Sequence, residues 1–156
     1  AGKRLLDNKA WYEAVLGTPD ESGSERSCNV HGVSVARTGE HSLCTTASGV
    51  YDGIGNAWEW VDATVNDGEY NGVMLPGSGY VTNADESGIA RETAEDTSPE
   101  SAFHNDYFWS EAKGEFAMIR GGYFASEDDA GMYSTQAKTV LTASGNAIGF
   151  RCAQDI

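Results

Sequence analysis

The stretch from Ile119 to Ala153, IRGGYFASEDDAGMYSTQAKTVLTASGNAIGFRCA, constrains the fold more than any other part of the chain. Its two ends, IRGGYF and AIGFRCA, carry the apolar and small residues that are typical of strands. The residues between them show neither a helical period nor a strict alternation. We therefore expect two paired strands, anchored by Ile119, Ile148 and Phe150, that hold both ends of a loop-rich segment in place.

One helix is predicted near the start of the chain. Asp7 is suited to cap its first turn and Gly17 to end it, and Pro19 blocks its continuation. The apolar stripe of this helix consists of Trp11, Ala14 and Val15.

The remaining chain is rich in loop residues. Tryptophans alternate in NAWEWVDATV, residues 56–65, and a β-branched tail follows, which predicts a strand. Residues 20–32 have the composition of a polar loop, and residues 83–100, which are acidic and polar, predict a long surface loop. Few helices, many loops and 19 glycines together indicate an α+β fold with much irregular structure.

Length and charge limit the classes of partner. A chain of 156 residues with 40% hydrophobic residues is one domain by length and can bury a core. Acidic residues outnumber basic ones by 24 to 10, for a formal charge of −14. Such a surface repels phosphates, so nucleic acid and anionic membranes are excluded as partners. No apolar run reaches the roughly 18–20 residues of a membrane span, so membrane insertion is not expected.

The three cysteines have no metal-binding spacing. Cys28 and Cys44 flank a polar loop, and either a disulfide in an oxidising compartment or two free thiols fits this arrangement. Cys152 alternates with Ile148 and Phe150 on one strand face, which predicts a buried structural thiol.

Motifs of common enzymes are absent from the sequence. The chain contains no HExxH, GxSxG or GxxxxGK[ST] pattern, which would place a zinc site, a nucleophile or a phosphate cradle. Its histidines lie in polar surroundings without metal-ligand spacing and are expected to be solvated loop residues. They are His31, His41 and His104.

Four motifs occur in an order that resembles a known family. AGKRLL precedes the helix, and GVYDGIGNAWEWV, IRGGYF and IGFRCA follow it. This pattern resembles the formylglycine-generating-enzyme-like family of sulfatase-modifying factors. The resemblance implies a variant of the C-type-lectin-like fold for residues 1–156, with small antiparallel sheets, few helices and many ordered loops. Family domains usually extend upstream of AGKRL, so the resemblance implies that this sequence starts partway into the domain or is a trimmed version of it.

The resemblance also implies a catalytic site that this chain lacks. In the enzymes, two cysteines shortly after the RGG hold a copper ion, which requires soft thiolate ligands. The matching positions here fall at Ser126 and at or near Gly131, and no cysteine lies between Cys44 and Cys152. We therefore expect no enzymatic oxidation of sulfatase cysteines.

A second branch of the same fold resembles the C-terminal stretch more closely. Variable proteins of diversity-generating retroelements carry a hypervariable segment between RGG and IGFR, with an AG pair that matches Ala130–Gly131. This resemblance implies that residues 123–147 form a variable ligand-binding segment on a rigid frame. The predicted ligand-binding residues are Tyr123, Ala125, Ser126, Asp129, Tyr133, Thr135, Thr139, Ala143, Gly145 and Ala147.

These resemblances predict a non-enzymatic ligand-binding or receptor-binding display domain. Its partner would be a protein or glycan on a cell surface, and its location would be extracellular, on a virion such as a phage, or at the cell surface. A homo-oligomer or a larger assembly is compatible with this role. One alternative is a formylglycine-generating-enzyme-like enzyme or accessory protein with different chemistry, and another is a structural module of a surface assembly.

A structural calcium site is predicted in YDGIGNAWEW. Calcium takes several oxygen ligands in a flexible arrangement, and the glycines in this stretch allow the backbone to curl around an ion. The family's calcium pattern maps onto the side chains of Asp52 and Glu59 and onto the carbonyls of Gly55 and Ala57. The alternative is that the two carboxylates cap a turn and pair with nearby cations. A second family site near Asn29–Val30 lacks its later aspartate and is not predicted.

Overall fold

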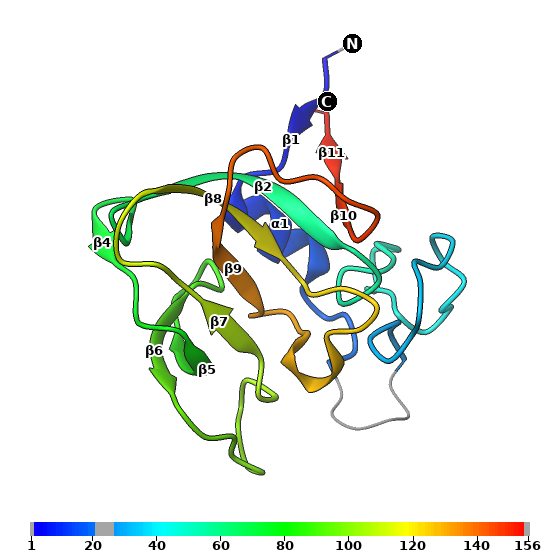
Figure 1. Cartoon of the computed structure of the whole chain (residues 1–156). Coiled ribbons are helices and arrows are strands. Elements are labelled where there is room, and N and C mark those ends of the chain that lie inside the picture. The colour runs from blue at the N-terminus through cyan, green and yellow to red at the C-terminus, as the bar shows by residue number, and fades with distance from the viewer. Residues whose placement is uncertain (1, 21–26, 155–156) are drawn as a thin grey trace.

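A curled, mixed β-sheet with one helix against it forms most of the molecule (Figure 1). The computed structural model describes residues 2–20 and 27–154. Within them the elements are β1 (Arg4–Leu5), α1 (Asn8–Val15), β2 (Trp58–Asn66), β3 (Glu69–Tyr70), β4 (Val73–Met74), β5 (Gly79–Ala84), β6 (Ala90–Ala94), β7 (Tyr107–Trp109), β8 (Glu115–Arg120), the 3-10 turn η1 (Glu127–Asp129), β9 (Thr135–Thr139), β10 (Ile148–Phe150) and β11 (Cys152–Ala153).

The main sheet has the strand order β4-β3-β2-β8-β9-β7-β5-β6, and β10 adds to β2. The β10·β2 and β7·β9 pairs are parallel, whereas the other pairs are antiparallel. A separate ribbon pairs β1 with β11, the first and last strands of the described residues (Figure 1). This is an α+β architecture, as the sequence predicts.

The predicted helix is confirmed as α1. The Asp7 carboxylate accepts a hydrogen bond of 2.8 Å from the Ala10 N–H, as a capping residue should. Gly17 takes a positive φ of 87° just past the end of the helix. Trp11 and Val15 are fully buried against the sheet, so the apolar stripe fixes the helix to one sheet face.

The predicted strand at residues 56–65 is confirmed as β2, which lies near the middle of the sheet. The two C-terminal frame strands, however, do not pair with each other. They lie on opposite sides of β2, where Trp60 is opposite Ile119 of β8 on one side and Phe150 of β10 on the other. The prediction that these two strands pair directly is therefore wrong. The residues of a strand do not indicate that another strand, here β2, lies between it and its expected partner.

The anchoring residues of the frame behave differently from one another. Ile119 is 2% exposed and confirmed as a core residue, whereas Ile148 is half-buried. Phe150 is 67% exposed and is not an anchor. The difference arises because β8 is flanked by β2 and β9, whereas β10 has only β2 as its partner.

The predicted loop at residues 83–100 is wrong in its first part. β5 and β6 form an antiparallel hairpin there. Its turn is organised by the Asp85 carboxylate, whose Oδ1 accepts from the N–H groups of Ser87 (2.8 Å) and Ile89 (3.1 Å). Ile89 and Ala90 are fully buried. The charged residues around them gave the segment its loop-like composition.

The cysteines take two different states. Cys28 and Cys44 form a buried disulfide, which decides between the two arrangements that the sequence left open. Cys152 is exposed and unbonded in β11, so the prediction of a buried thiol is wrong. The strand belongs to the terminal ribbon outside the main sheet, where the other ribbon strand is its partner (Figure 1). The predicted polar loop at residues 20–32 lies partly outside the described residues, at 21–26.

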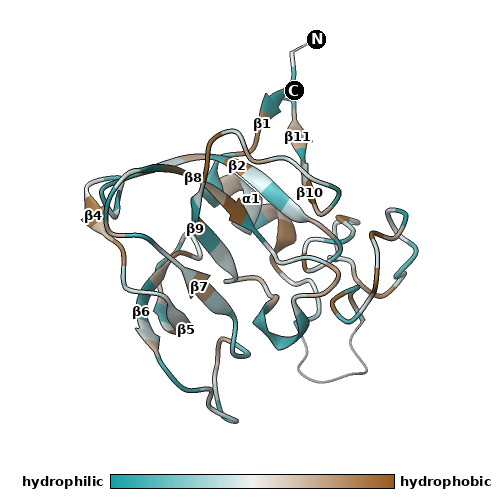
Figure 2. Cartoon of the chain, in the orientation of Figure 1, coloured by the Kyte–Doolittle hydropathy of each residue, from teal (hydrophilic) through white to brown (hydrophobic). Residues whose placement is uncertain are grey.

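Two apolar clusters hold the fold together. The larger lies between α1 and the sheet and includes Trp11, Phe108 and Met118. The smaller lies beneath the loops around the disulfide and includes Val30 and Ile54. Figure 2 shows apolar residues along β8, whereas the loops mix hydrophilic and hydrophobic residues. In the described part of the chain no helix is long and apolar enough to cross a membrane.

Candidate functional site

The motifs GIGN and RGGYF meet in space, although about 60 residues separate them in the sequence. The Gly55 N–H donates to the Gly121 carbonyl at 2.8 Å, and the Phe124 N–H donates to the Asn56 carbonyl at 3.1 Å. A Cβ at Gly121 would lie 2.7 Å from the Gly53 carbonyl oxygen. Glycine is therefore required here because two backbones approach too closely for a side chain.

Asn56 links this junction to the loop that precedes it. Its side-chain Oδ1 accepts from the Asn29 amide at 3.0 Å and from the Ala36 N–H at 2.8 Å. Its φ of 61° is left-handed, a conformation that asparagine tolerates better than most residues. The side chain of Asn29 is thus used to position a loop. The GIGN motif therefore fixes the loop that follows the disulfide cysteine Cys28.

Three of the four predicted calcium residues line one pocket of about 270 Å³. They are Asp52, Ala57 and Glu59, and the guanidinium of Arg151 lines the same pocket. Asp52 is 6% exposed, and its Oδ2 accepts from the Gly39 N–H at 2.8 Å. Gly55, the fourth, is buried, and its carbonyl accepts from the Ala57 N–H at 2.8 Å.

Glu59 already has partners in this pocket. Its Oε2 accepts from the Trp11 indole at 2.7 Å and from the Arg151 guanidinium at 2.6 Å. Burial raises the pKa of Glu59, Arg151 lowers it in opposition, and the nearby Asp52 charge raises it further. The alternative prediction of pairing with a cation therefore describes Glu59 well.

The oxygen donors fit a hard cation in kind, but such an ion would share Glu59 with Arg151. In residues 2–20 and 27–154 no group of three or more His, Cys, Asp and Glu side chains is arranged to hold a metal. The predicted calcium set has only two carboxylates and draws its other ligands from carbonyls, so it remains a proposal.

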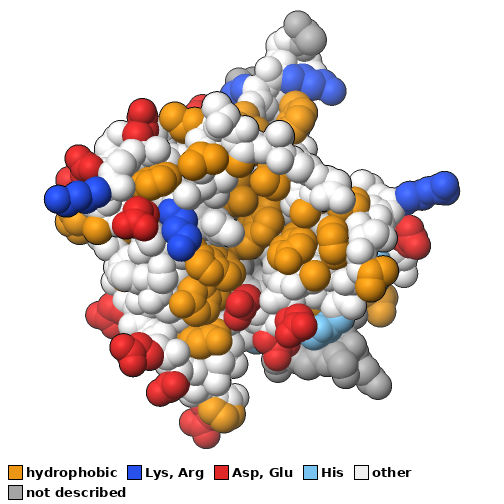
Figure 3. Space-filling view, viewed as in Figure 1, with side chains coloured by type: hydrophobic (Ala, Val, Ile, Leu, Met, Phe, Trp, Pro, Cys, Tyr) orange, Lys and Arg blue, Asp and Glu red, His pale blue; other side chains and the backbone are white. Residues whose placement is uncertain are grey.

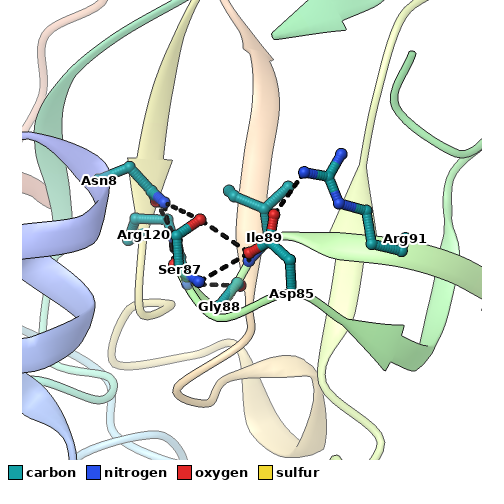
Figure 4. Close-up of polar contacts among 7 residues, drawn as sticks. All are labelled: Asn8, Asp85, Ser87, Gly88, Ile89, Arg91 and Arg120. Atoms are coloured by element: carbon teal, nitrogen blue, oxygen red, sulfur yellow. Dashed lines mark hydrogen bonds and ion pairs between the residues drawn. The ribbon is translucent and has the colours of Figure 1, made fainter. Parts of the chain in front are cut away.

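The arginine of the RGG motif fixes three parts of the chain at once. Arg120 is fully buried and donates to the Asn8 side-chain oxygen, to the Gly88 carbonyl at 3.0 Å and to the Met132 carbonyl at 2.9 Å. Figure 4 shows it between the helix and the β5–β6 turn. Its guanidinium carbon also lies 4.8 Å from the centre of the Trp11 ring. Burial lowers the pKa of Arg120 to about 10, so the side chain remains a cation at neutral pH.

The predicted ligand-binding segment, residues 123–147, separates into exposed and buried positions. Ala125 and Gly145 are exposed. The half-buried positions are Tyr123, Ser126, Asp129, Tyr133, Ala143 and Ala147.

Two of the predicted binding residues do not face solvent. Thr135 is 0% exposed and Thr139 is 8% exposed, because both point inward from β9, which lies between β8 and β7. Their assignment to a binding surface is therefore wrong. This strand is hard to recognise in the sequence because its inward residues include threonines, which are polar and also common in loops.

Tyr133 also packs inward to a large extent. Its ring lies 4.9 Å from that of Phe103 and 5.8 Å from that of Tyr12, measured between centroids. The two tyrosine hydroxyls are 3.3 Å apart. Burial raises the pKa of Tyr133 strongly, and the hydrogen bond with Tyr12 adds to this effect. The aromatic ring therefore contributes mainly to packing.

The two positions that match the copper-binding cysteines do not fit a copper site. The Ser126 hydroxyl accepts from the Tyr123 N–H at 3.0 Å and closes a local turn. A Cβ at Gly131 would lie 1.7 Å from Oδ1 of the buried Asp106. A hydroxyl is a poor ligand for Cu(I), and Gly131, which lies at or near the second position, has no room for a side chain.

The comparison with family models agrees with this arrangement of motifs. Residues 6–156 match the model described as the sulfatase-modifying factor enzyme 1-like domain. The chain belongs to this family. Its C-type-lectin-like fold agrees with the observed curled sheet and single described helix. None of the curated proteins compared with this sulfatase-modifying-factor-like chain matches it significantly.

Sequence reasoning missed one surface feature of this family member. A row of aromatic side chains crosses β5, β7 and β2, where Tyr80, Tyr107, Trp109 and Trp58 contact one another in turn. The alternation in YFW, residues 107–109, is the local signal for it. Three residues are too few to distinguish a strand from a loop.

Proposed function

We propose that this domain is a non-enzymatic member of its family that binds a ligand through the exposed part of residues 123–147. The observation that carries the proposal is the cysteine content. The chain has three cysteines, and two of them, Cys28 and Cys44, are joined to each other. No pair of thiolates remains to hold copper, whereas the scaffold around the corresponding positions is retained.

The packing of the segment supports a display role. Arg120 and the glycine junction fix the start of the segment, and the pairing of β10 with β2 fixes its end. Exposed positions such as Ala125 and Gly145 lie between these fixed points. Substitutions away from packing typically change stability by within about 0.5 kcal/mol. Many sequences at these positions would therefore fold, as in the loops of antibodies.

The proposed setting is extracellular, on a virion or at a cell surface, with a protein or glycan as partner. The Cys28–Cys44 disulfide favours an oxidising compartment. The formal charge of −14 disfavours anionic partners. The proposed calcium ion, held by Asp52, Glu59 and neighbouring carbonyls, would have a structural role beside the segment.

A selection experiment tests the binding function. One displayed library randomises Ala125, Asp129, Ala143 and Gly145, and a matched library randomises four buried positions of the same segment. The buried positions are Ala130, Thr135, Ala137 and Thr139. We expect folded binders of lysozyme, used as a model target, from the first library and mostly unfolded variants from the second. Failure of the first library to yield any folded binder would contradict the proposal.

The genome tests the relation to retroelement variable proteins separately. A neighbouring reverse transcriptase and a near-duplicate template of the codons for residues 123–147 are expected. Their absence would leave a binding domain whose segment is not diversified by this route.

A further inference from the structure

The face of the sheet opposite α1 carries an aromatic ladder. Strand alternation directs Val81 and Phe108 into the core, where they are 1% and 0% exposed. Their neighbours therefore point to the other face. Ring centroids are 4.9 Å apart between Tyr80 and Tyr107, and 4.6 Å apart between Tyr107 and Trp109. We call Tyr80, Tyr107 and Trp109 the aromatic ladder.

The ladder is anchored at one end and open at the other. Trp109 contacts the 6%-exposed Trp58 at 5.6 Å between centroids in an edge-to-face arrangement. All three ladder residues are half-buried. Figure 3 shows hydrophobic side chains gathered over β7 and β5 on the face toward the viewer, with acidic side chains beside them. The three rings are therefore in contact with one another and partly accessible from solvent.

The turn η1, which carries Asp129, lies beside the ladder strand β7, because the Ser134 hydroxyl donates both to the Asp129 carbonyl at 2.6 Å and to the Tyr107 carbonyl at 3.4 Å. Burial raises the pKa of Tyr80, and the charges of Asp129 and Asp96 act on the same phenol and raise it further. Asp129 belongs to η1, and Asp96 follows β6. Loss of hydration and the adjacent charges of Asp128 and Glu127 raise the pKa of Asp129. Asp129 therefore lies among further acidic residues of η1, Glu127 and Asp128.

One cation of this face belongs to the neighbouring strand. Lys138 is exposed on β9 and has the same orientation as Gln136, which lies opposite Trp109. It is adjacent to the anchored end of the ladder, whereas Asp129 and Asp96 act on Tyr80 at the open end.

We propose that the aromatic ladder and Asp129 bind an arginine or lysine side chain of a protein partner. A cation is attracted to the negative face of an aromatic ring and to the carboxylate beside it, and a chain of charge −14 attracts basic segments at long range. A neutral sugar could stack on the rings, but it would not neutralise the charge of the Asp129 carboxylate. The proposal deepens the proposed function, because Asp129 lies within residues 123–147.

The test uses the whole domain and two labelled peptides. The first is a fluorescein-labelled Gly-Arg-Gly-Arg-Gly amide, and the second replaces each arginine by neutral citrulline. Fluorescence anisotropy should show binding of the arginine peptide and at least fivefold weaker binding of its citrulline counterpart. Tyr107→Leu should weaken binding of the arginine peptide about two- to fivefold, the range of an exposed cation–π contact. Asp129→Asn should weaken it similarly.

Two matched variants control for total charge and for general loss of aromatic surface. Glu69→Gln removes one exposed charge on β3, on the other side of β2 and β8 from the ladder. Phe150→Leu removes an exposed ring on β10, which pairs with β2 and not with the strands that carry the ladder. Both should leave the dissociation constant within a factor of about 1.5. The dissociation constant of each variant is measured at a temperature below the unfolding transition of that variant.

Several results would overturn the proposal. The first is equal binding of the two peptides, and the second is no binding of the arginine peptide. The third is that Asp129→Asn and Glu69→Gln weaken binding equally while Tyr107→Leu has no effect. Binding of neutral maltohexaose that Tyr107→Leu abolishes, without binding of the arginine peptide, would make the ladder a sugar platform instead. Recovery of lysozyme binders in the selection would leave the display function standing in any of these cases.

Discussion

At the scale of single residues, two features determine how the C-terminal segment is held. Arg120 is a buried cation that donates to three oxygens from separate parts of the chain. Gly121, Gly122 and Gly131 permit backbone approaches that a Cβ would block. Each of these features is local, and each predicts a different consequence of substitution.

Replacement of Arg120 by methionine should lower the free energy of unfolding by about 2–4 kcal/mol. The change keeps an apolar stem but leaves the buried acceptors on Asn8, Gly88 and Met132 without a donor, and each unsatisfied group costs about 1–3 kcal/mol in a non-additive way. Urea unfolding gives the measurement. Arg37→Met, at an exposed position, is the control and should change stability by within about 0.5 kcal/mol. Equal effects of the two variants would contradict the role of Arg120.

Two glycines of the segment, one buried and one exposed, allow the effect of packing on stability to be measured. Gly131→Ala should destabilise the domain by about 1–3 kcal/mol, because its Cβ would lie 1.7 Å from the Asp106 carboxylate. Gly145→Ala meets no atom within 4 Å and should be neutral or slightly stabilising. The two variants are compared by urea unfolding. The reverse order of stability would show that the contacts around Gly131 are assigned incorrectly.

At the scale of elements, the sequence predicts those helices and strands whose residues carry a clear local pattern. The Asp7 cap and the stripe of Trp11 and Val15 predict α1, and the alternating tryptophans predict β2. The hairpin of β5 and β6 escapes prediction because charged residues surround its buried Ile89 and Ala90. β9 escapes because it is short and polar in composition.

Strand order and side-chain pairing are also beyond local patterns. β8 and β10 are recognisable as strands, but nothing in their residues indicates that β2 separates them. Likewise, the carboxylates Asp52 and Glu59 are identifiable from their motif. The pairing of Glu59 with Arg151, from the other end of the chain, depends on the fold.

The loop that leads into β2 is the element in which calcium is expected. If calcium binds Asp52 and Glu59, it should raise the thermal midpoint, and a chelator should lower it, since a ligand at 100 times its dissociation constant stabilises a protein by about 2.7 kcal/mol. Asp52→Asn should reduce this response, whereas Asp62→Asn, at an exposed position of β2, should not. A midpoint that neither calcium nor chelator changes, with no metal in elemental analysis, would rule out the site.

At the scale of the whole molecule, the chain has the fold of its family, and we propose that it lacks the family's copper site. Residues 6–156 match the sulfatase-modifying factor enzyme 1-like domain, and the motifs that define the resemblance meet around Gly55 and Gly121. The positions that the family resemblance assigns to copper ligands fall at Ser126 and at or near Gly131, and neither residue is a cysteine. We propose that in this chain the fold serves binding and not oxidation.

Mass spectrometry of a sulfatase-type CxPxR peptide tests this central claim most directly. The peptide is incubated with the domain, with and without added copper, beside a no-protein sample and a family enzyme that has the cysteine pair as positive control. We predict that the cysteine of the peptide stays unmodified in every sample with this domain, because the two thiolates that would hold copper are absent. Formylglycine above the level of the no-protein sample would contradict the account.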